Sequence, residues 1–168
     1  MDRVTRFAPM PRFGELGVTV TLQGLVVVHW ARSGPESPVS GSPEDGAEPL
    51  VTVAAQWLAH LREYLEGSRR AFPLPIAWEA LPPFQRAVLR ATFAIPYGEV
   101  RTYGEVATAI GRPRAARAVG RALATNPMPI VVPCHRVVGH DRRLHGYGGP
   151  GGLMTKAWLL QLEGVNLP

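Results

Sequence analysis

Cys134 is the only cysteine in a chain of 168 residues. A single cysteine leaves no partner for a disulfide within the chain and argues against a cysteine-rich zinc site, so the fold has to be held together by packing. A chain of this length can bury a sizeable core, as one domain or as two small ones. It has neither a run of about 18 apolar residues nor an apolar stretch behind residues 1–6, which predicts no membrane span and no secretory signal. We therefore expect a cytoplasmic protein that keeps its thiol reduced.

The first part of the chain has the pattern of a small β-sheet. Over residues 16–22 apolar side chains alternate with smaller or polar ones, which is the period of a half-buried strand. Gln23-Gly24 interrupts the pattern and residues 25–30 continue it, so we predict a β-hairpin. Residues 32–49 are rich in Pro, Gly, Ser and acidic side chains and predict a mobile loop.

Helical spacing of apolar residues follows between Leu50 and Glu66. Pro49 suits the first turn of this helix and Gly67 suits its C-terminal cap. The fold class expected is therefore α+β, with a small β-sheet and helix domain over residues 1–73 that supports a mainly helical domain over residues 74–168.

The second domain contains the pattern of a helix-turn-helix. One helix is expected to end at Pro96, which cannot continue it. Thr102 and Glu105 have the spacing of a capping box, which begins the next helix. That helix is expected to end at Gly111, and Pro113 is suited to opening another one. A last helix is predicted from Leu153 to Glu163.

Positive charge is concentrated in the second domain. Residues 1–73 contain seven Arg and eight Asp or Glu, a net charge of −1, whereas residues 74–168 contain eleven Lys or Arg and five Asp or Glu, a net charge of +6. Arg114, Arg117 and Arg121 would line one side of the second helix of the helix-turn-helix, among small residues. This pattern fits sequence-independent contact with nucleic-acid phosphates, and it also fits an ordinary solvated basic face.

The single cysteine lies in the segment Pro133-Cys134-His135-Arg136-Val137. A thiolate is the nucleophilic form of cysteine, and neighbouring positive charge lowers the pKa of a thiol. The flanking His135 and Arg136 therefore predict a reactive Cys134.

This segment and several others resemble the O6-alkylguanine-DNA alkyltransferases, a family of single-use DNA-repair proteins. The resemblance runs from about Phe72 to Gly164 and agrees in spacing from Tyr103 to Tyr147. It rests on the following motifs, in the family's order: Ile95-Pro96-Tyr97-Gly98-Glu99-Val100, Thr102-Tyr103-Gly104, Arg117-Ala118-Val119-Gly120, Asn126-Pro127 to Ile130, the Cys134 segment, Gly146-Tyr147, and Lys156 to Glu163-Gly164.

The resemblance implies irreversible transfer of the alkyl group of O6-alkylguanine from double-stranded DNA to Cys134. The sequence leaves open whether O4-methylthymine is a second substrate. His135 would act as the base through a water molecule, Glu163 would orient His135, and Tyr103 would donate a hydrogen bond towards guanine N3. The residues implied for the substrate pocket are Asn126, Val137, Tyr147 and Gly148, and the backbone carbonyls of Cys134 and Val137 would accept hydrogen bonds from the guanine exocyclic amine. No cofactor is implied, and the protein is expected to act as a monomer that is nucleoid-associated in a bacterium.

The resemblance also implies how DNA is held. The second helix of the helix-turn-helix would enter the minor groove while the damaged nucleotide is flipped out, and Arg117 would take the place of that nucleotide. Tyr103 would turn the 3′ phosphate. Further contacts to DNA are expected from Ala115, Ala116, Ala118, Gly120, Arg121 and Arg136, of which Arg136 is either structural or a phosphate contact.

Two segments depart from the family pattern. The Gly148–Gly152 segment is about two residues longer than usual. In the family this loop forms one wall of the alkyl pocket and a backbone amide contacts O6, so the extra length affects the assignment of Gly148 to that contact. Asp141-Arg142-Arg143 replaces a turn that normally carries glycine. His140 and His145 could be taken for a metal pair, but loop residues near DNA are the simpler interpretation.

Three other functions fit parts of the sequence. An alkyltransferase-like protein that only marks lesions would lack the reactive cysteine. A helix-turn-helix regulator would need a longer recognition helix and a dimerisation segment. A cysteine hydrolase would need an oxyanion hole, for which no motif is present.

Overall fold

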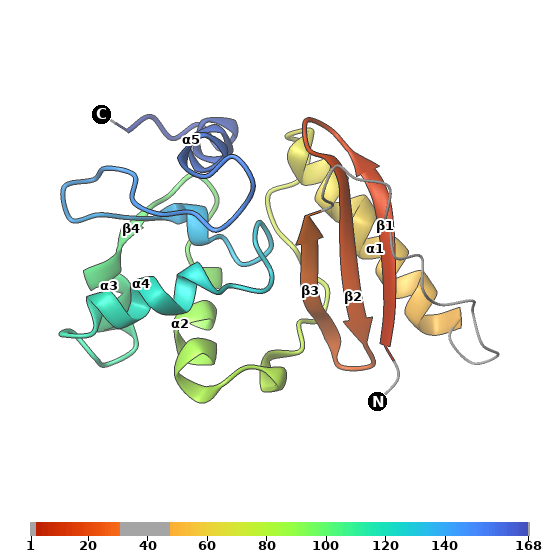
Figure 1. Ribbon diagram of the computed structural model, residues 1–168, viewed down its shortest axis with the longest axis horizontal. Helices are drawn as coiled ribbons and strands as arrows, with labels where there is room; N and C mark the ends of the chain where they lie inside the picture. The colour runs from red at the N-terminus through yellow and green to blue at the C-terminus, as the bar shows by residue number, and fades with distance from the viewer. Residues whose placement is uncertain (1–2, 31–47, 168) are drawn as a thin grey trace. The chain divides into compact units, whose positions relative to one another are not determined.

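The computed structural model describes residues 3–30 and 48–167, and the chain divides into two compact units, Met1–Ala80 and Leu81–Pro168 (Figure 1). The first unit combines a sheet with one long helix, and the second is mainly helical. The α+β class expected from the sequence is confirmed. No helix in the described part of the chain is long and apolar enough to cross a membrane.

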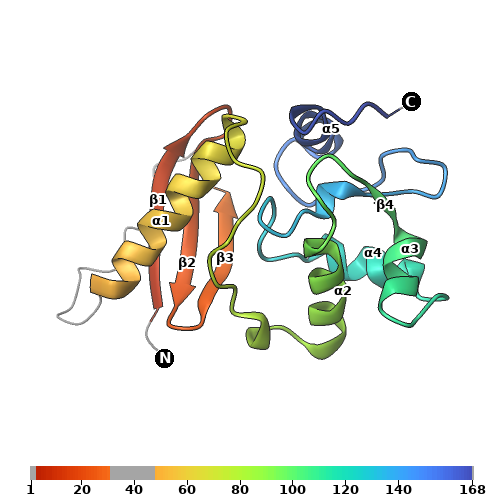
Figure 2. The ribbon, with the colours of Figure 1, turned by 180° about the vertical axis from the view of Figure 1, so that it is seen from behind.

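The first unit is built on an antiparallel sheet of β1 (Arg3–Met10), β2 (Gly14–Thr21) and β3 (Gly24–Trp30), in that order. Helix α1 (Glu48–Leu65) covers one face of the sheet, as Figure 2 shows from behind. The predicted hairpin corresponds to β2 and β3. Strand β1 was not predicted, because its side chains are mostly exposed or half-buried and show no regular alternation.

Helix α1 begins at Glu48, two residues earlier than expected, and Pro49 lies in its first turn. Gly67 follows with φ of 82°, a conformation that glycine adopts without strain. The rest of the loop predicted over residues 32–49, residues 32–47, lies outside the described part of the chain.

The first unit extends to Ala80, seven residues beyond the boundary expected from the sequence. Leu25 of β3 donates its backbone N–H to Pro75 and accepts one from Ala77, both at 2.9 Å. These bonds attach the segment 74–80 to the edge of the sheet, although its composition resembles that of a linker.

The second unit contains four α-helices and a pair of two-residue strands. Helices α2, α3 and α4 lie together, and the segment that contains β4 lies between them and α5 (Figure 1). The elements are α2 (Pro83–Phe93), β4 (Arg101–Thr102), α3 (Tyr103–Ala109), α4 (Ala116–Ala124), a 3-10 turn η2 (Cys134–Arg136), β5 (Val137–Val138) and α5 (Leu153–Leu162).

Helices α3 and α4 form the helix-turn-helix. The capping box is present: Thr102 accepts a hydrogen bond from the Glu105 amide at 3.1 Å, and Glu105 accepts one from the Thr102 amide at 2.6 Å. Helix α4 begins at Ala116, later than Pro113 suggested, so Arg114 lies in the turn before the helix. Arg117 and Arg121 are one turn apart on α4 and share an exposed side.

Candidate active site

The two short strands bring the start of α3 next to the cysteine segment. Strands β4 and β5 pair in parallel, with Arg101 opposite Val137 and Thr102 opposite Val138. Tyr103 directly follows β4, and the η2 turn that begins at Cys134 directly precedes β5. Residues about 30 positions apart in the sequence are therefore adjacent in the structure.

Cys134 lies at a cavity of about 190 Å³. Its side chain is largely buried, with 9% of the residue exposed. Small residues dominate the cavity wall, which leaves room for a flat ligand beside the sulfur. The wall is formed by Tyr103, Gly120, Leu123, Ala124, Gly146, Tyr147 and Gly148.

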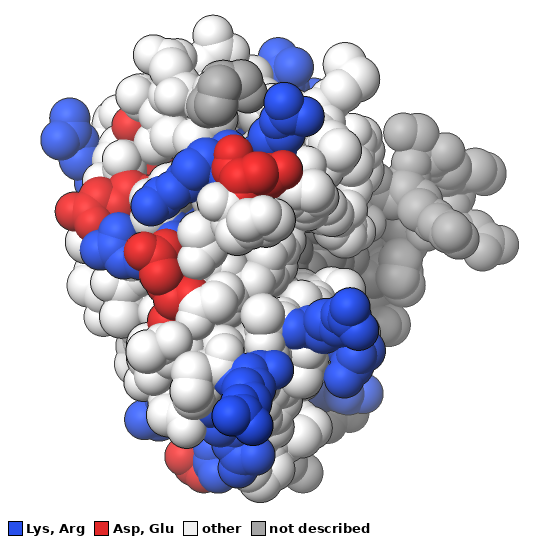
Figure 3. Space-filling view, turned by 90° about the vertical axis from the view of Figure 1, so that its left-hand side faces the viewer, with Lys and Arg blue, Asp and Glu red and all other residues white. Residues whose placement is uncertain are grey.

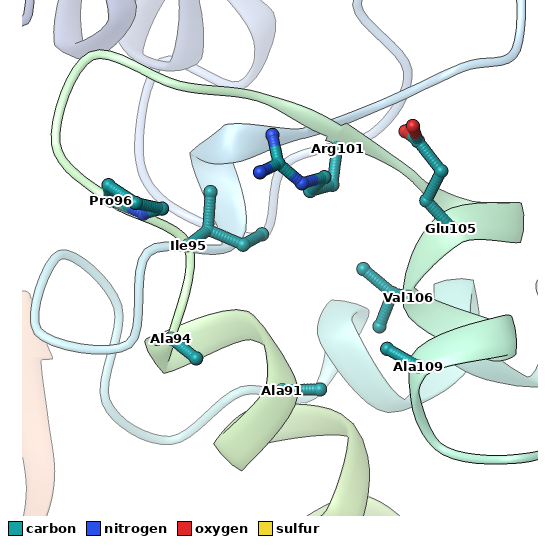
Figure 4. Close-up of a pocket in the computed structure, with 8 residues that line it drawn as sticks. All are labelled: Ala91, Ala94, Ile95, Pro96, Arg101, Glu105, Val106 and Ala109. Carbon is teal, nitrogen blue, oxygen red and sulfur yellow. The ribbon is translucent and has the colours of Figure 1, made fainter.

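A second, larger cavity of about 280 Å³ lies between α2 and α3. Figure 4 shows alanine and aliphatic side chains around it, with Arg101 and Glu105 at one side. It contains no nucleophile, and Glu105 is already used as a helix cap. The smaller cavity at Cys134 is therefore the candidate reaction centre.

A buried network next to Cys134 is centred on Glu163. Its carboxylate oxygen Oε1 lies 2.8 Å from Nε2 of His135, and both side chains are fully buried. Arg136 donates to the same carboxylate through Nε and Nη2, each at 2.9 Å. Because the carboxylate only accepts, Nε2 of His135 carries the hydrogen, and Nδ1 of the neutral ring has the lone pair.

The segment Ile95 to Gly98 holds this network in place. Arg136 donates to the Ile95 carbonyl at 2.5 Å, and Gly98 donates its backbone N–H to Glu163 at 3.0 Å. Tyr97 donates to the Leu162 carbonyl at 3.1 Å. Gly98 has φ of 80°, and a β-carbon there would meet the Glu163 carbonyl at 3.2 Å. Both facts favour glycine at this position.

The structure favours one of the two roles expected for Arg136 and corrects the expectation about which charge acts on the thiol. The Arg136 side chain is 7% exposed and points to Glu163 and Ile95, so its buried position argues against a phosphate contact. The charge that acts on the sulfur also differs from the one expected. Burial raises the pKa of the Cys134 thiol. The positive charge that opposes this effect and lowers the pKa is that of Lys156, not that of His135 or Arg136.

Lys156 is the functional residue that the sequence analysis left without a role. It is the only lysine in the chain and is 1% exposed. Its Nζ donates to the carbonyls of Val137 at 2.6 Å, His145 at 2.8 Å and Gly146 at 3.2 Å. Burial lowers the pKa of Lys156 to about 8. The residue thus ties the strand after Cys134 to the opposite wall of the cavity.

The sequence did contain a signal for Lys156. It precedes Glu163, the residue that directly follows α5, by seven residues, which is two helical turns, so the two side chains lie on the same side of α5. Leu159 and Leu160 between them are buried. A charged residue on a buried helical face requires partners, and here the partners are backbone carbonyls.

His135 has the protonation state that a base needs. Burial lowers the pKa of its imidazole, against the opposing effect of the hydrogen bond to Glu163. The ring is therefore neutral near neutral pH and can accept a proton.

Asn126 fixes the loop that leads to Cys134. Its side chain donates to the Val132 carbonyl at 2.9 Å and accepts from the Met128 amide at 3.0 Å. A hydrogen bond from Asn126 also lowers the pKa of Cys134, second in size to the effect of burial. Ile130 in this loop has φ of 72°, which is strained for a β-branched residue.

Of the expected pocket residues, Tyr147 and Gly148 line the cavity together with Tyr103, whereas Asn126 and Val137 are not among its lining residues. Tyr103 donates its hydroxyl hydrogen to the His145 carbonyl at 2.8 Å. Gly148 lies close to Ala124, whose carbonyl a β-carbon would meet at 3.1 Å. The Val137 carbonyl, expected to accept from the guanine amine, already accepts from Lys156 and retains one lone pair for a second donor.

The second unit also contains exposed arginines. Arg117 and Arg121 project from α4, and Arg142 and Arg143 project from the loop after β5. Figure 3 shows blue Lys and Arg side chains gathered in patches on one face of the molecule, with a few red carboxylates among them. Of the expected small residues, Ala115 precedes α4, while Ala116, Ala118 and Gly120 are half-buried within it.

The two segments that depart from the family pattern have unusual backbone conformations. Arg142 has φ of 60°, consistent with a turn in which glycine is usual. Gly151 and Gly152 have φ of 78° and 53°. Asp141 pairs with His145 at 3.2 Å. Within residues 3–30 and 48–167 there is no group of three or more His, Cys, Asp or Glu side chains that could hold a metal.

Comparisons with known proteins agree with this geometry. Residues 83–165 match the family described as 6-O-methylguanine DNA methyltransferase, DNA binding domain. A methylated-DNA–protein-cysteine methyltransferase of Methanosarcina barkeri is 50% identical over 127 residues, covering 70% of this chain and 78% of the relative. The constitutive enzyme of that name from Bacillus subtilis is 46% identical over 106 residues, 63% of each chain.

Solved structures agree over nearly the whole chain. The Mycobacterium tuberculosis protein OGT in complex with DNA is 35% identical, with a TM-score of 0.75, over 95% of this chain and 91% of that one. Both the sequence and the fold therefore place the chain in one family. The chain belongs to the methylated-DNA–protein-cysteine methyltransferases, which repair alkylated guanine in DNA by transferring the alkyl group to a cysteine of their own.

Proposed function

We propose that Cys134 accepts the alkyl group from O6-alkylguanine in double-stranded DNA, once per protein molecule. The observation that supports this most directly is the position of the only cysteine, which lies at a small cavity beside a buried His135–Glu163 pair. A nucleophile, a neutral base and a group that orients the base are the components of nucleophilic catalysis.

The proposed reaction starts from a neutral thiol. Nδ1 of His135 takes the thiol proton through a water molecule, while Glu163 holds Nε2–H. The thiolate attacks the alkyl carbon, the S–C bond forms, and the C–O6 bond breaks. The electron pair of that bond passes to the guanine ring, which then takes up a proton. The thioether product has no leaving group that ordinary nucleophiles displace, so the protein is used once.

We propose that α4 meets the minor groove and that the damaged nucleotide is flipped into the cavity. Arg117 would fill the space left in the base stack, and Tyr103 would contact the 3′ phosphate and the base. Removing a base from the stack costs a few kcal/mol, which a filling side chain partly offsets. Small residues on α4 present few polar groups to base edges, so binding independent of sequence is expected.

The protein is proposed to act as a monomer in the cytoplasm. A single free thiol suits a reducing compartment. Sedimentation of the protein with a short duplex would give a mass of one protein per DNA at low occupancy. A dimer at all concentrations would contradict the proposal.

Intact-mass measurement after incubation with excess O6-methylguanine duplex tests the proposed reaction. One added methyl group, mapped to Cys134 and absent from Cys134→Ala, is the expected result. Tight binding without a change in mass would instead indicate a lesion-marking protein. A parallel duplex containing O4-methylthymine tests the second substrate.

A further inference from the structure

Two tyrosines line the cavity at Cys134, and their hydroxyl groups differ in their hydrogen bonding. Tyr103 donates its hydrogen to the His145 carbonyl at 2.8 Å. The hydroxyl of Tyr147 is buried and has no hydrogen-bond partner within the described residues. A buried hydroxyl without a partner is unfavourable, and such groups in native proteins are normally satisfied by water or by a ligand.

A tyrosine hydroxyl has one hydrogen to donate. Tyr103 would have to release His145 before it could donate to a bound base. Tyr147 has no such bond to break, so its hydroxyl is the donor that is ready in the structure as observed.

Tyr147 and Cys134 line the same cavity. The tyrosine as a whole is partly exposed at the cavity wall, whereas its hydroxyl is buried. Burial and, after it, the negative charge of the Cys134 thiolate raise the pKa of Tyr147 well above its usual value. The hydroxyl therefore keeps its hydrogen while the thiolate attacks.

A guanine whose alkyl carbon faces Cys134 must present its O6 on the same side. N7 is adjacent to O6 on this edge, and both atoms are hydrogen-bond acceptors. Gly148, from the same wall, is the residue whose amide was expected at O6.

We propose that the Tyr147 hydroxyl donates a hydrogen bond to the O6–N7 edge of the flipped guanine and stabilises the leaving group. This inference rests on the function proposed above for the cavity. As the C–O6 bond breaks, negative charge develops on the guanine ring. A hydrogen bond donated to this edge is therefore stronger in the transition state than in the bound substrate, and it accelerates the transfer.

The transfer rate of Tyr147→Phe at saturating O6-methylguanine duplex tests the proposal. We expect a rate about 10- to 100-fold lower than in the wild type, as for other buried donors to developing charge. DNA affinity should be unchanged, and the melting temperature should be equal or higher because an unpartnered hydroxyl is removed. Tyr64→Phe, the same change in the first unit, is the matched control and should transfer at the wild-type rate.

Two results would overturn the proposal. One is a wild-type transfer rate in Tyr147→Phe, and the other is a lower rate that is accounted for by a lower melting temperature. Absence of methylation in the wild type would instead contradict the proposed function itself, so the two failures are distinguishable.

A duplex with O6-methyl-7-deazaguanine identifies the acceptor. If N7 accepts, the wild type should lose rate on this substrate and Tyr147→Phe should show no further loss. If O6 accepts, Tyr147→Phe should lose the same factor on both substrates. Equal rates of the two proteins on both substrates would contradict a bond to either atom.

Discussion

Arg136 and Glu163 form a buried ion pair in which two guanidinium nitrogens each lie 2.9 Å from the carboxylate. The same carboxylate holds His135 at 2.8 Å. Glu163 thereby orients the proposed base while its charge is compensated by a cation that does not reach the cavity wall. The arginine in the cysteine motif thus supports the site from behind and is not one of the residues that line the cavity.

Replacing Arg136 by Leu should destabilise the protein by about 3–5 kcal/mol, because the Glu163 carboxylate would stay buried without its partner. Urea unfolding at neutral pH measures the change. The matched control is Arg101→Leu, which breaks an exposed pair with Glu99 at 2.8 Å and should cost less than about 1 kcal/mol. Equal losses in the two variants would contradict a structural role for the buried pair.

The pKa of Lys156 should be measurable directly, because it is the only lysine in the chain. Protein labelled with ¹⁵N at the lysine Nζ should give one side-chain signal whose titration midpoint is about 8, below the ordinary value of 10.5. A midpoint near the ordinary value would mean that Nζ is in contact with water.

This lowered pKa also predicts how stability depends on pH. Between about pH 8 and pH 10.5 the unfolded lysine binds more protons than the folded one, so the free energy of unfolding should rise with pH. The rise should be about 1–3 kcal/mol and should be absent after Lys156→Met. Both measurements belong in a Cys134→Ala background, which removes the titration of the thiol. A flat difference between the two proteins across this range would refute the prediction.

Lys156→Met should also slow alkyl transfer near neutral pH. The positive charge of Lys156 lowers the pKa of Cys134 against the effect of burial, so its removal should raise that pKa. The rising limb of transfer rate against pH should therefore move to higher pH. An unchanged limb with a uniformly lower rate would point to the three carbonyl contacts of Lys156 instead of its charge.

Arg117 and Arg121 should have different roles although they share one side of α4. Arg117→Ala should slow transfer from duplex DNA about 10- to 100-fold, because a few kcal/mol of stacking would be lost without a filling side chain. Transfer from the free base O6-methylguanine should be unaffected. Arg121→Ala should make the slope of log binding constant against log salt concentration less steep by about one. It should leave the transfer rate at saturating DNA unchanged. The reverse pattern would exchange the two assignments.

The capping box should stabilise the helix that carries Tyr103. Thr102→Ala removes the acceptor for the Glu105 amide and should cost about 1 kcal/mol. Thr108→Ala on the same helix removes a hydroxyl that bonds only the Gly104 carbonyl at 3.0 Å, and it should change stability by less than about 0.5 kcal/mol. Chemical denaturation of the two variants side by side is the test.

The features predicted correctly from the sequence depend on residues that are close together in the chain. The hairpin over residues 16–30 follows from period-two alternation, and the capping box from the spacing of Thr102 and Glu105. The end of α4 shows the limit of such local rules. The carbonyl of Ala122 in its last turn and that of Thr125, which directly follows the helix, accept hydrogen bonds from Gln85, a residue about 40 positions away.

The directions of charged side chains could not be predicted in this way. His135 and Arg136 follow Cys134 in sequence, yet both turn to Glu163, and Lys156 from α5 supplies the charge near the sulfur. The extension of the first unit to Ala80 likewise depends on backbone pairing with Leu25.

The sequence by itself determined the α+β class, the hairpin of β2 and β3, the capping box of α3, the cysteine proposed as the nucleophile, and the family that the chain resembles, because short-range spacing and a motif carry that information. Only the tertiary structure decided which charges act on Cys134, and which tyrosine at its cavity has a hydroxyl without a partner among residues 3–30 and 48–167. Those outcomes depend on burial and on contacts between segments that are far apart in the chain. Burial makes every buried charge and polar group require a partner, and only the folded chain specifies which partner is within reach.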